Sequence, residues 1–470
     1  MTLKTPLPFS ADEDDLRGDS RYWWQHLTWY HWFVVLVASM AWFFDCLDQR
    51  IFSLARNPAL NALKANGITP KEVQDFGKVV TAFFLIGWGV GGMIFGALGD
   101  KFGRTRMLTT TILIYSVFTG LSFFSRSWWD FTLFRFLTGF GVGGVFGLAV
   151  ALIAETVPSV ARTQSLGLLQ ILSAVGNVSA SFVMMGITKL ETLKFLPTGQ
   201  GWRYMFLVGA APALMVIFTG RFLREPEPWL RLKERGLLPK GSIFVPYVKL
   251  FRERRWRRNL IVGALIASTG VVGLWAIGEY AVDLQRNIFS SYFAARVPRA
   301  DVLSHVNDSI AIAFLLTQLG AVAGMWIFTR IALAAGRRLA FFIGFSAALL
   351  VTVMVYWKMS TPQDAYWMMP LMGAAQLSVF AGFSIYLPEL FPSGMRSTGT
   401  SFCYNLGRFA AAGGSFFSAA LSQGIFKNAD KSSPLPLRYS AMSMCVIFLV
   451  GIATLPFAPE TRGKPLPEDS

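Results

Sequence analysis

The sequence has few acidic residues, cysteines and histidines for its length. Its 470 residues include 27 Asp and Glu against 43 Lys and Arg, with only 3 Cys and 3 His. The cysteines lie in apolar stretches without a CxxC spacing, and neither a metal-ligand cluster nor a nucleophile motif is evident. We therefore expect no disulfide, no metal site, no cofactor and no enzyme activity. Residues 1–21 are polar, so we also expect no cleavable signal peptide.

Apolar residues, by contrast, are abundant. They make up 53% of the chain, and the mean hydropathy is +0.47, which is typical of a polytopic membrane protein. A helix needs about 20 consecutive apolar residues to cross a bilayer. The pattern predicts an all-α integral membrane protein with twelve spans, at 29–55, 76–98, 107–125, 128–154, 164–187, 202–222, 259–284, 309–334, 339–357, 365–387, 397–421 and 439–457.

The net charge of +16 does not indicate a nucleic-acid partner, because the basic residues follow the predicted topology. Lys and Arg are in excess in the segments on the same side as the N-terminus, which predicts that both termini are cytoplasmic. Three arginines, Arg50, Arg135 and Arg408, fall inside predicted spans. The expected partners are the lipid bilayer of the cell membrane and a small-molecule substrate, with the protein a monomer.

The chain repeats itself at one common offset. ETVPSVART at 155–163 recurs as ELFPSGMRS at 389–397, and Asp45, Asp130 and Gly139 recur as Glu279, Asp364 and Gly373. Several matches at a single offset indicate internal duplication. We predict two six-helix bundles, 1–222 and 259–470, joined by a basic cytoplasmic linker at 223–258. Parallel repeats of this kind build transporters with a site between the halves.

Glycines also recur at a spacing of four residues. They are Gly139, Gly143 and Gly147 in the fourth span, and Gly87/Gly91 and Gly92/Gly96 in the second. This spacing places them on one helix face and lets neighbouring backbones approach closely. We assign them to helix packing rather than to substrate binding.

Four motifs resemble those of the major facilitator superfamily, over essentially the whole chain. They are GALGDKFGRTRML at 96–108, RFLTGFGVGG at 135–144, PEPWL at 226–230 and PETRGKP at 459–465. The last two are similar to motifs of the sugar-porter and the aromatic-acid or sialate:proton symporter branches. The resemblance implies the major facilitator fold and secondary transport.

The resemblance also assigns charged residues to a cytoplasmic gate. Asp100 and Arg104 are expected to pair with charges on the facing half when that side is closed; the alternative is a charged turn that only sets topology. The second half keeps Arg337 but has lost the acid, so the two gates are expected to be unequal. Within each half we expect Glu155 to act with Arg162 and Glu389 with Arg396.

Acids inside the first span suggest proton coupling. By depth along their helices, Asp48 is expected to meet Arg135. A carboxylate that gains and loses such a partner changes its proton affinity, and the form Asp45-x-x-Asp48 resembles that of aromatic-acid and sialate symporters. Glu279 is a further acid, with two alternative roles: closing the outer gate or holding a second proton. The alternative is a static ion pair that joins two spans.

Polar residues at mid-depth suggest a substrate pocket. Arg408 either binds an anionic substrate through its planar fork or pairs with an acid from another helix. Each of the remaining candidates either contacts the ligand or forms a hydrogen bond with a neighbouring helix. They are Gln170, Asn177, Gln318, Gln376, Tyr404 and Asn405. Trp88, Trp275 and Phe383 are expected to supply aromatic walls.

We therefore predict a secondary transporter that moves a small organic acid or sugar-like metabolite by alternating access, with proton symport. Residues around Thr269 and Gly270 lack the glutamines and asparagine of sugar porters, which weakens a hexose interpretation. The alternatives are a facilitative uniporter and a non-transporting membrane sensor with the same fold.

Overall fold

The computed structural model describes residues 22–468, apart from 64–69, 240, 279, 300 and 421–434. These residues form helices joined by turns, and no strand occurs among them. The first half of the chain contains α1 (Trp29–Leu63), α2 (Pro70–Phe102), α3 (Arg104–Leu121), α4 (Trp128–Thr156), α5 (Ser159–Thr192), α6 (Gly201–Gly209) and α7 (Met215–Phe222). The second contains α10 (Arg254–Val272), α11 (Tyr280–Ala294), α12 (Val302–Ala335), α13 (Arg337–Lys358), α14 (Pro362–Glu389), α15 (Arg396–Ala420), α16 (Leu435–Met444) and α17 (Val446–Thr454).

Eleven helical segments of the described residues are long and apolar enough to cross a membrane. They include Arg254–Ala294, which joins α10 and α11 through a π-helical turn at Gly273–Gly278. The eleventh predicted span, 397–421, coincides with α15, but α15 is not among the eleven. The reason is its polar content, because Arg396, Thr400, Asn405 and Arg408 are all buried within it. The exact number of twelve spans therefore stays a prediction.

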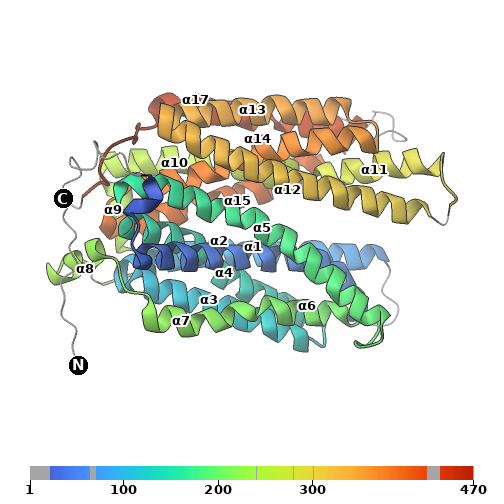
Figure 1. The fold of residues 1–470 in the computed structure, drawn as a ribbon, viewed down its shortest axis with the longest axis horizontal. Helices are drawn as coiled ribbons and strands as arrows, with labels where there is room; N and C mark the ends of the chain where they lie inside the picture. The colour runs from blue at the N-terminus through green and yellow to red at the C-terminus, as the bar shows by residue number, and fades with distance from the viewer. Residues whose placement is uncertain are drawn as a thin grey trace.

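The helices form two groups that lie side by side (Figure 1). The helices α1–α7 occupy the lower part of the picture and α10–α14 with α17 the upper part, while α15 lies between them. The main contacts between the groups join α15 to α2 and α4, and α5 to α12 and α14. The start of α1 and the described segment that follows α17 lie at one end of the long axis, which we call the terminal end. The division at 223–258 stays a prediction.

The glycines at a spacing of four bring α2 against two neighbours, as predicted. Gly87 and Gly91 meet backbone atoms of Phe136 and Phe140 on α4, and a Cβ at either position would overlap them. Gly92 and Gly96 meet Asn405 and Ser401 on α15. Because no side chain stands between them, α2 approaches α4 and α15 closely enough to join the two halves.

The predicted linker contains two short helices at the terminal end, α8 (Glu227–Glu234) and α9 (Val245–Arg252). Trp229 donates its indole N–H to the Asp100 carbonyl, at 2.9 Å, and Tyr247 donates its hydroxyl to the Met93 carbonyl, at 2.7 Å. These contacts hold the linker against the end of α2. Helix α10 begins at Arg254, so its first residues belong to the segment 223–258 that was predicted to be the linker.

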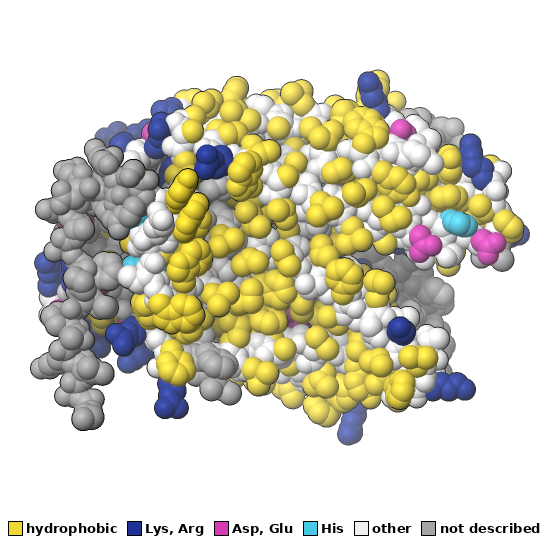
Figure 2. Space-filling model, viewed as in Figure 1, with side chains coloured by type: hydrophobic (Ala, Val, Ile, Leu, Met, Phe, Trp, Pro, Cys, Tyr) yellow, Lys and Arg dark blue, Asp and Glu magenta, His cyan; other side chains and the backbone are white. Residues whose placement is uncertain are grey.

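The side of the molecule shown in Figure 2 carries a broad belt of hydrophobic side chains, with Lys and Arg gathered toward its two ends. That distribution is what a bilayer demands of the surface it surrounds. Figure 2 also shows a recess between the two groups of helices at the end opposite the termini.

Candidate substrate and coupling site

Arg408 of α15 lies buried between the two groups of helices, with 4% of its surface exposed. Its guanidinium carbon stands 3.3 Å from the centre of the Trp88 ring on α2 and 4.9 Å from that of Tyr404. The Nε and Nη1 atoms have no hydrogen-bond acceptor among the described residues. A buried cation with open donors is costly unless a ligand completes it.

Asp45 of α1 is fully buried, and both of its carboxylate oxygens lack a donor in the part of the chain that is described. Arg408 is the opposite charge that acts on it, yet no ion pair joins the two side chains within 4 Å among the described residues. The two groups are therefore near each other but not neutralised by direct contact. An acid and a cation so placed can share a bound molecule that bridges them.

Asp48, one turn further along α1, forms the predicted ion pair with Arg135 of α4. Asp48 Oδ2 lies 3.5 Å from Arg135 Nη1, and both side chains are fully buried. Thr119 of α3 donates its hydroxyl to Asp48 Oδ1 at 2.8 Å. Arg135 donates to the hydroxyl of Ser122 at 2.8 Å and stands over the Phe206 ring at 4.6 Å. All of these partners belong to the first half of the chain.

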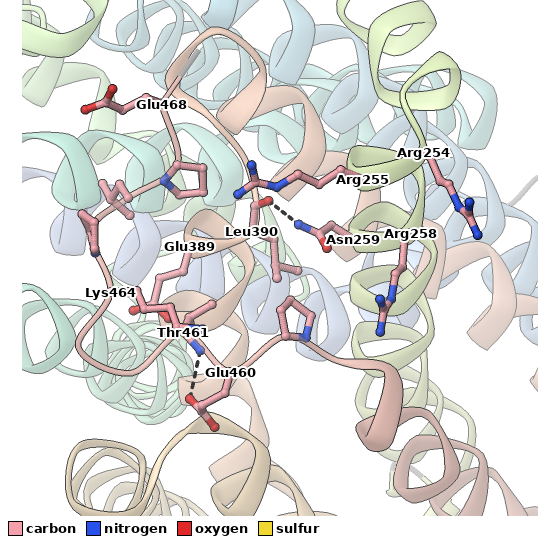
Figure 3. A pocket seen from close by; sticks show the side chains of 14 residues that line it. Arg254, Arg255, Arg258, Asn259, Glu389, Leu390, Glu460, Thr461, Lys464 and Glu468 are labelled. Atoms are coloured by element: carbon pink, nitrogen blue, oxygen red, sulfur yellow. Dashed lines mark hydrogen bonds between the residues drawn. The ribbon is translucent and has the colours of Figure 1, made fainter. Parts of the chain in front are cut away.

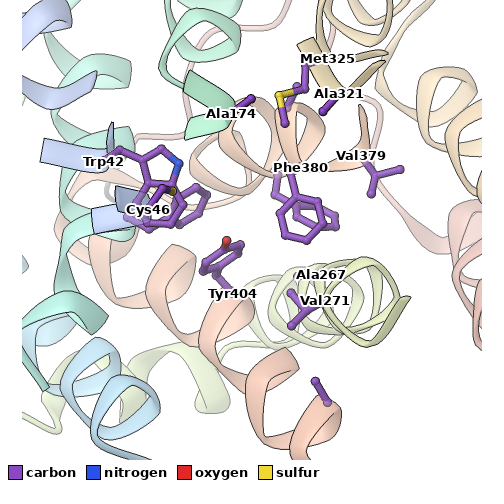
Figure 4. Packing of buried hydrophobic residues seen from close by; sticks show 14 of the residues in the cluster. Trp42, Cys46, Ala174, Ala267, Val271, Ala321, Met325, Val379, Phe380 and Tyr404 are labelled. Atoms are coloured by element: carbon purple, nitrogen blue, oxygen red, sulfur yellow. The ribbon is translucent and has the colours of Figure 1, made fainter. Parts of the chain in front are cut away.

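Aromatic side chains surround the central residues. Tyr404 stacks on Phe146 of α4 with ring centres 3.9 Å apart, and Trp42 of α1 lies 5.1 Å from Phe146. Figure 4 shows the Tyr404 hydroxyl pointing toward the region between Trp42 and Phe380. Of the predicted walls, Trp88 and Trp275 meet edge to face at 6.5 Å, and Phe383 lies 6.4 Å from Tyr404. The sequence did not single out Trp42, Phe146 or Phe380, because aromatics in spans are too common to be informative.

The predicted polar residues divide into two kinds. Gln376 donates to the Thr352 hydroxyl of α13 at 2.8 Å, and Asn405 donates to the Ser401 carbonyl while lying against Gly92. Gln376 is thus held by a neighbouring helix and Asn405 by its own, although Asn405 Oδ1 has no donor among the described residues. Gln170 accepts a hydrogen bond from the Trp42 indole at 3.2 Å, close to the central aromatics.

Two other candidates are less constrained. Gln318 of α12 is buried with its Oε1 lacking a donor in the described structure. Asn177 of α5 is half-buried. Glu279, predicted as a coupling acid, lies outside the described residues.

Charged residues at the terminal end join the two halves. Glu155 of α4 pairs with Arg396 of α15 at 2.6 Å and with Arg104 of α3 at 3.1 Å. Glu389 pairs not with Arg396 but with Arg337 of α13, at 2.7 Å. Arg337 also reaches across to the Thr163 hydroxyl of α5 at 2.8 Å. Three of the four predicted latch charges, Glu155, Glu389 and Arg396, thus form ion pairs at this end, and the role of all four as a latch stays a prediction.

The predicted partner of Asp100 also needs correction. Its carboxylate accepts hydrogen bonds from the backbone N–H groups of Ser397 and Thr398, at 3.1 and 2.8 Å, and from the Thr398 hydroxyl at 2.5 Å. Apart from Arg104 of its own half, at 3.0 Å, Asp100 thus meets a helix N-terminus and not a charged side chain. The first N–H groups of a helix have no partner within it and carry partial positive charge, so they attract an acid.

Two glutamates that the sequence analysis did not select hold the gate helices in place. Glu225 accepts the N–H groups of Thr105 and Arg106 at 3.1 and 3.0 Å at the start of α3. Glu460 accepts those of Arg337 and Arg338 at 3.0 and 3.1 Å at the start of α13. Glu460 lies in the second half-ending motif and Glu225 directly before the first, so the repetition of these motifs was the available signal.

The glycines before these two helices leave room for the glutamates. Gly103 and Gly336 have φ of +113° and +97°, and a Cβ at either would run into the carboxylate of Glu225 or Glu460. Burial raises the pKa of Glu225 despite its backbone donors. At Glu460 burial also acts to raise the pKa, but the backbone N–H groups outweigh it and the pKa is lowered.

The sequence profile of the family described as "Sugar (and other) transporter" matches residues 28–469. The chain belongs to this family. It is a major facilitator superfamily transporter of the sugar or organic-acid type, spans a membrane with many helices and binds small molecules; the family consists of transporters, not enzymes.

Curated relatives match the chain over most of its length. A "Putative metabolite transport protein" of Haemophilus influenzae is 28% identical over 93% of this chain and 98% of its own length. A "Probable 4-methylmuconolactone transporter" of Cupriavidus pinatubonensis is 26% identical over 90% of this chain and 89% of its own. A "Cis,cis-muconate transport protein" of Acinetobacter baylyi is 26% identical over 80% and 84%.

Solved structures share the fold. The proton:xylose symporter XylE bound to 6-bromo-6-deoxy-D-glucose superposes with a TM-score of 0.70 at 17% identity, over 93% of this chain and 98% of that one. The human organic anion transporter MFSD10 gives a TM-score of 0.62 at 16% identity, over 90% and 98%. At this identity the likeness concerns the fold alone.

Proposed function

We propose that the transporter carries a small organic anion across the cell membrane together with a proton, by alternating access. The observation that carries this proposal is Arg408, a buried guanidinium with two nitrogens that lack an acceptor among the described residues. A planar carboxylate fits such a fork better than an uncharged sugar does. The relatives named for muconate and 4-methylmuconolactone transport support the same class.

The surroundings of Arg408 narrow the class further. Trp88 and Tyr404 lie against its guanidinium, and Trp42 and Phe146 lie beyond Tyr404. Aromatic side chains favour a flat, apolar body, while Gln170 offers an amide for a second polar group. We infer a planar, unsaturated or aromatic carboxylate, with Gln170, Gln318 and Asn177 as further candidates to contact it.

The proton is assigned to the two acids of α1. Asp48 faces Arg135, and a change in that 3.5 Å contact between conformations would change the acid's affinity for a proton. Asp45 lies near Arg408, the cation proposed to bind the substrate, so it can couple the proton and the substrate directly. Glu279 stays a candidate for a second proton site.

One ion pair and two sets of hydrogen bonds at the terminal end act as a latch between the two halves. In the present conformation Glu155–Arg396, Arg337–Thr163 and Asp100 with the start of α15 hold the halves together there. We infer that they separate when the carrier opens toward that side, and that the side is cytoplasmic. The working unit is a monomer without a cofactor.

The orientation has a direct test. The described cysteines Cys46, Cys403 and Cys445 are all buried, so a cysteine introduced by Ser242→Cys in the linker reports on its own. We expect an impermeant maleimide to label it only after the membrane is opened. Labelling of intact cells would reverse the orientation.

The function is tested in two steps. A thermal-shift screen of the purified protein against aromatic acids, short unsaturated dicarboxylates, sugar acids and neutral sugars should show stabilisation by carboxylates, because a ligand stabilises the state that it binds. Uptake into proteoliposomes, with and without an imposed pH gradient, then separates the alternatives. Uptake that ignores the gradient would indicate a uniporter, and binding without any uptake would indicate a sensor.

A further inference from the structure

A groove of about 720 Å³ lies on the outer surface of the second half, between α10 and α17, at the terminal end. Its walls change character along the helix. Arg254, Arg257 and Arg258 line one part, and apolar side chains such as Ile261, Leu265 and Phe457 line the rest. Neither the substrate site nor the latch uses any of these residues.

The cationic part of the groove is open to a ligand. All three arginines are exposed, and none forms an ion pair among the described residues. One nitrogen of Arg258 donates to the Phe457 carbonyl at 3.1 Å, which ties α10 to the end of α17. Glu253, the acid next to them in sequence, is exposed and unpaired within the described chain.

A second pocket next to the groove shares two of these arginines. In Figure 3, Arg255 points toward the C-terminal segment that contains Thr461, whereas Arg254 and Arg258 point away from it.

The apolar part continues directly from the arginines. Arg257, Ile261 and Leu265 are spaced by four residues, so they follow one face of α10, and Leu265 lies about 12 Å along the helix from Arg257. Ile261, Leu265 and Phe457 are 51%, 42% and 60% exposed. In a membrane protein such a face is in contact with acyl chains, and its cationic end is at the depth of the headgroups.

We propose that this groove is a binding site for one anionic phospholipid. Its phosphate would be held by Arg254, Arg257 and Arg258, and one acyl chain would follow Ile261 and Leu265 toward the bilayer centre. Any lipid satisfies the apolar part, but three unpaired guanidinium groups favour a headgroup with net negative charge over a zwitterionic one. Soluble phosphate lacks the acyl chain that the apolar part of the groove accommodates.

The proposed lipid site is independent of the transported substrate. It is also independent of which side of the membrane the terminal end faces, because the site is defined by its place at that end. Its place at the start of α10 gives the lipid a role at the junction of the linker and the seventh span. A bound lipid would fix the start of α10 against α17 from outside the protein.

The test compares retained lipids. The protein is reconstituted in nanodiscs that contain equal amounts of phosphatidylglycerol and phosphatidylcholine, released into mild detergent, and its bound lipids are counted by native mass spectrometry. We expect the wild type to retain one phosphatidylglycerol in preference to phosphatidylcholine. Each arginine removed should weaken that preference roughly fivefold.

Three variants separate the site from general charge. R254Q/R257Q/R258Q should lose the preference. R231Q/R235Q/K249Q removes the same charge from exposed positions on the linker and should keep it. Val450→Trp, which fills the apolar part without changing the charge, should also lose it. Equal retention of the two lipids by the wild type, an unchanged groove variant, or displacement by glycerol phosphate alone would overturn the proposal.

Discussion

At the scale of single residues, the centre of the protein is defined by groups that lack partners. Arg408 and Asp45 are buried, and the described structure leaves two nitrogens and two oxygens without hydrogen bonds. Arg135, by contrast, is bonded by Ser122 and Thr138 and paired with Asp48. Arg408 therefore has donors to offer a ligand, whereas the donors of Arg135 are largely taken.

Arg408→Lys should weaken binding of a carboxylate substrate by more than about tenfold, although the positive charge is kept. Lysine lacks the planar pair of donors, and a hydrogen bond between charged groups contributes about 1.5–3 kcal/mol. Substrate-dependent thermal shift or equilibrium binding measures the effect. Arg56→Lys is the control, since in the described structure Arg56 donates a hydrogen bond to the Thr81 hydroxyl and is no candidate to contact the substrate. Equal losses in both variants would contradict a substrate role for Arg408.

At the scale of elements, helix N-termini decide how the terminal end closes. Three helices there begin on a carboxylate from elsewhere in the chain: α15 on Asp100, α3 on Glu225 and α13 on Glu460. Glu225 and Glu460 stay within their own halves. Asp100 alone of these three crosses between halves, and Leu333 stands at the equivalent place before Gly336. The proposed latch is therefore asymmetric, because an acid of the first half caps a helix of the second half and the equivalent position in the second half is a leucine.

Asp100→Asn should slow transport and leave substrate affinity nearly unchanged, because the cap biases one conformation and does not touch the ligand. Asn keeps an acceptor but loses the charge that the helix terminus attracts, which is worth about 0.3–1 kcal/mol or more when buried. Uptake rate and binding are measured together. Asp364→Asn, which alters a cap inside the second half, is the control; lost affinity with normal turnover would count against the latch.

Glu460→Gln should lower thermal stability at neutral pH by a shift that disappears in acid. The pKa of Glu460 is lowered in the folded protein, so its contribution is present above the unfolded value, about 4.3, and is lost as the pH falls through the folded value. Unfolding temperatures of wild type and variant should converge below that range. Glu468→Gln, an exposed change nearby, should show no such convergence; a shift that is independent of pH would exclude the charge as its cause.

At the scale of the whole molecule, the two halves meet along α15 and α2 and along α5 and α12. Contacts at the terminal end are charged, while those further along are aromatic, with Arg50 of α1 standing over Phe314 of α12 at 4.0 Å. Charged contacts made through a few side chains can break without disturbing either half. The two-group arrangement is compatible with the alternating access proposed above, in which one half rocks against the other.

Asp48→Asn should abolish accumulation against a gradient while leaving exchange of substrate intact. The amide mimics a permanently protonated acid, so binding and the conformational change remain but no proton is released. Counterflow and pH-driven uptake in proteoliposomes measure the two activities separately. Asp130→Asn, an exposed acid at a helix start, should retain both; normal accumulation by Asp48→Asn would return Asp48 to a structural role.

The sequence determined much of this protein by itself, because a bilayer allows few solutions. Apolar length predicted the helices, glycine spacing predicted which faces of α2 pack, and depth along the spans predicted that Asp48 meets Arg135. These are local or one-dimensional properties. The second half-ending motif contained Glu460, and Glu225 directly precedes the first, although their role at helix starts needed coordinates.

Only the tertiary structure decided which charges pair. Glu155 pairs with Arg396 and Glu389 pairs with Arg337. Both partners lie on other helices, far away in the sequence, that meet at the terminal end. It also gave the amide N–H groups of Gln376 and Asn405 acceptors on α13 and α15, whereas two nitrogens of Arg408 lack an acceptor among the described residues. A spacing fixes a residue's depth and face, but its partner depends on how whole helices are packed.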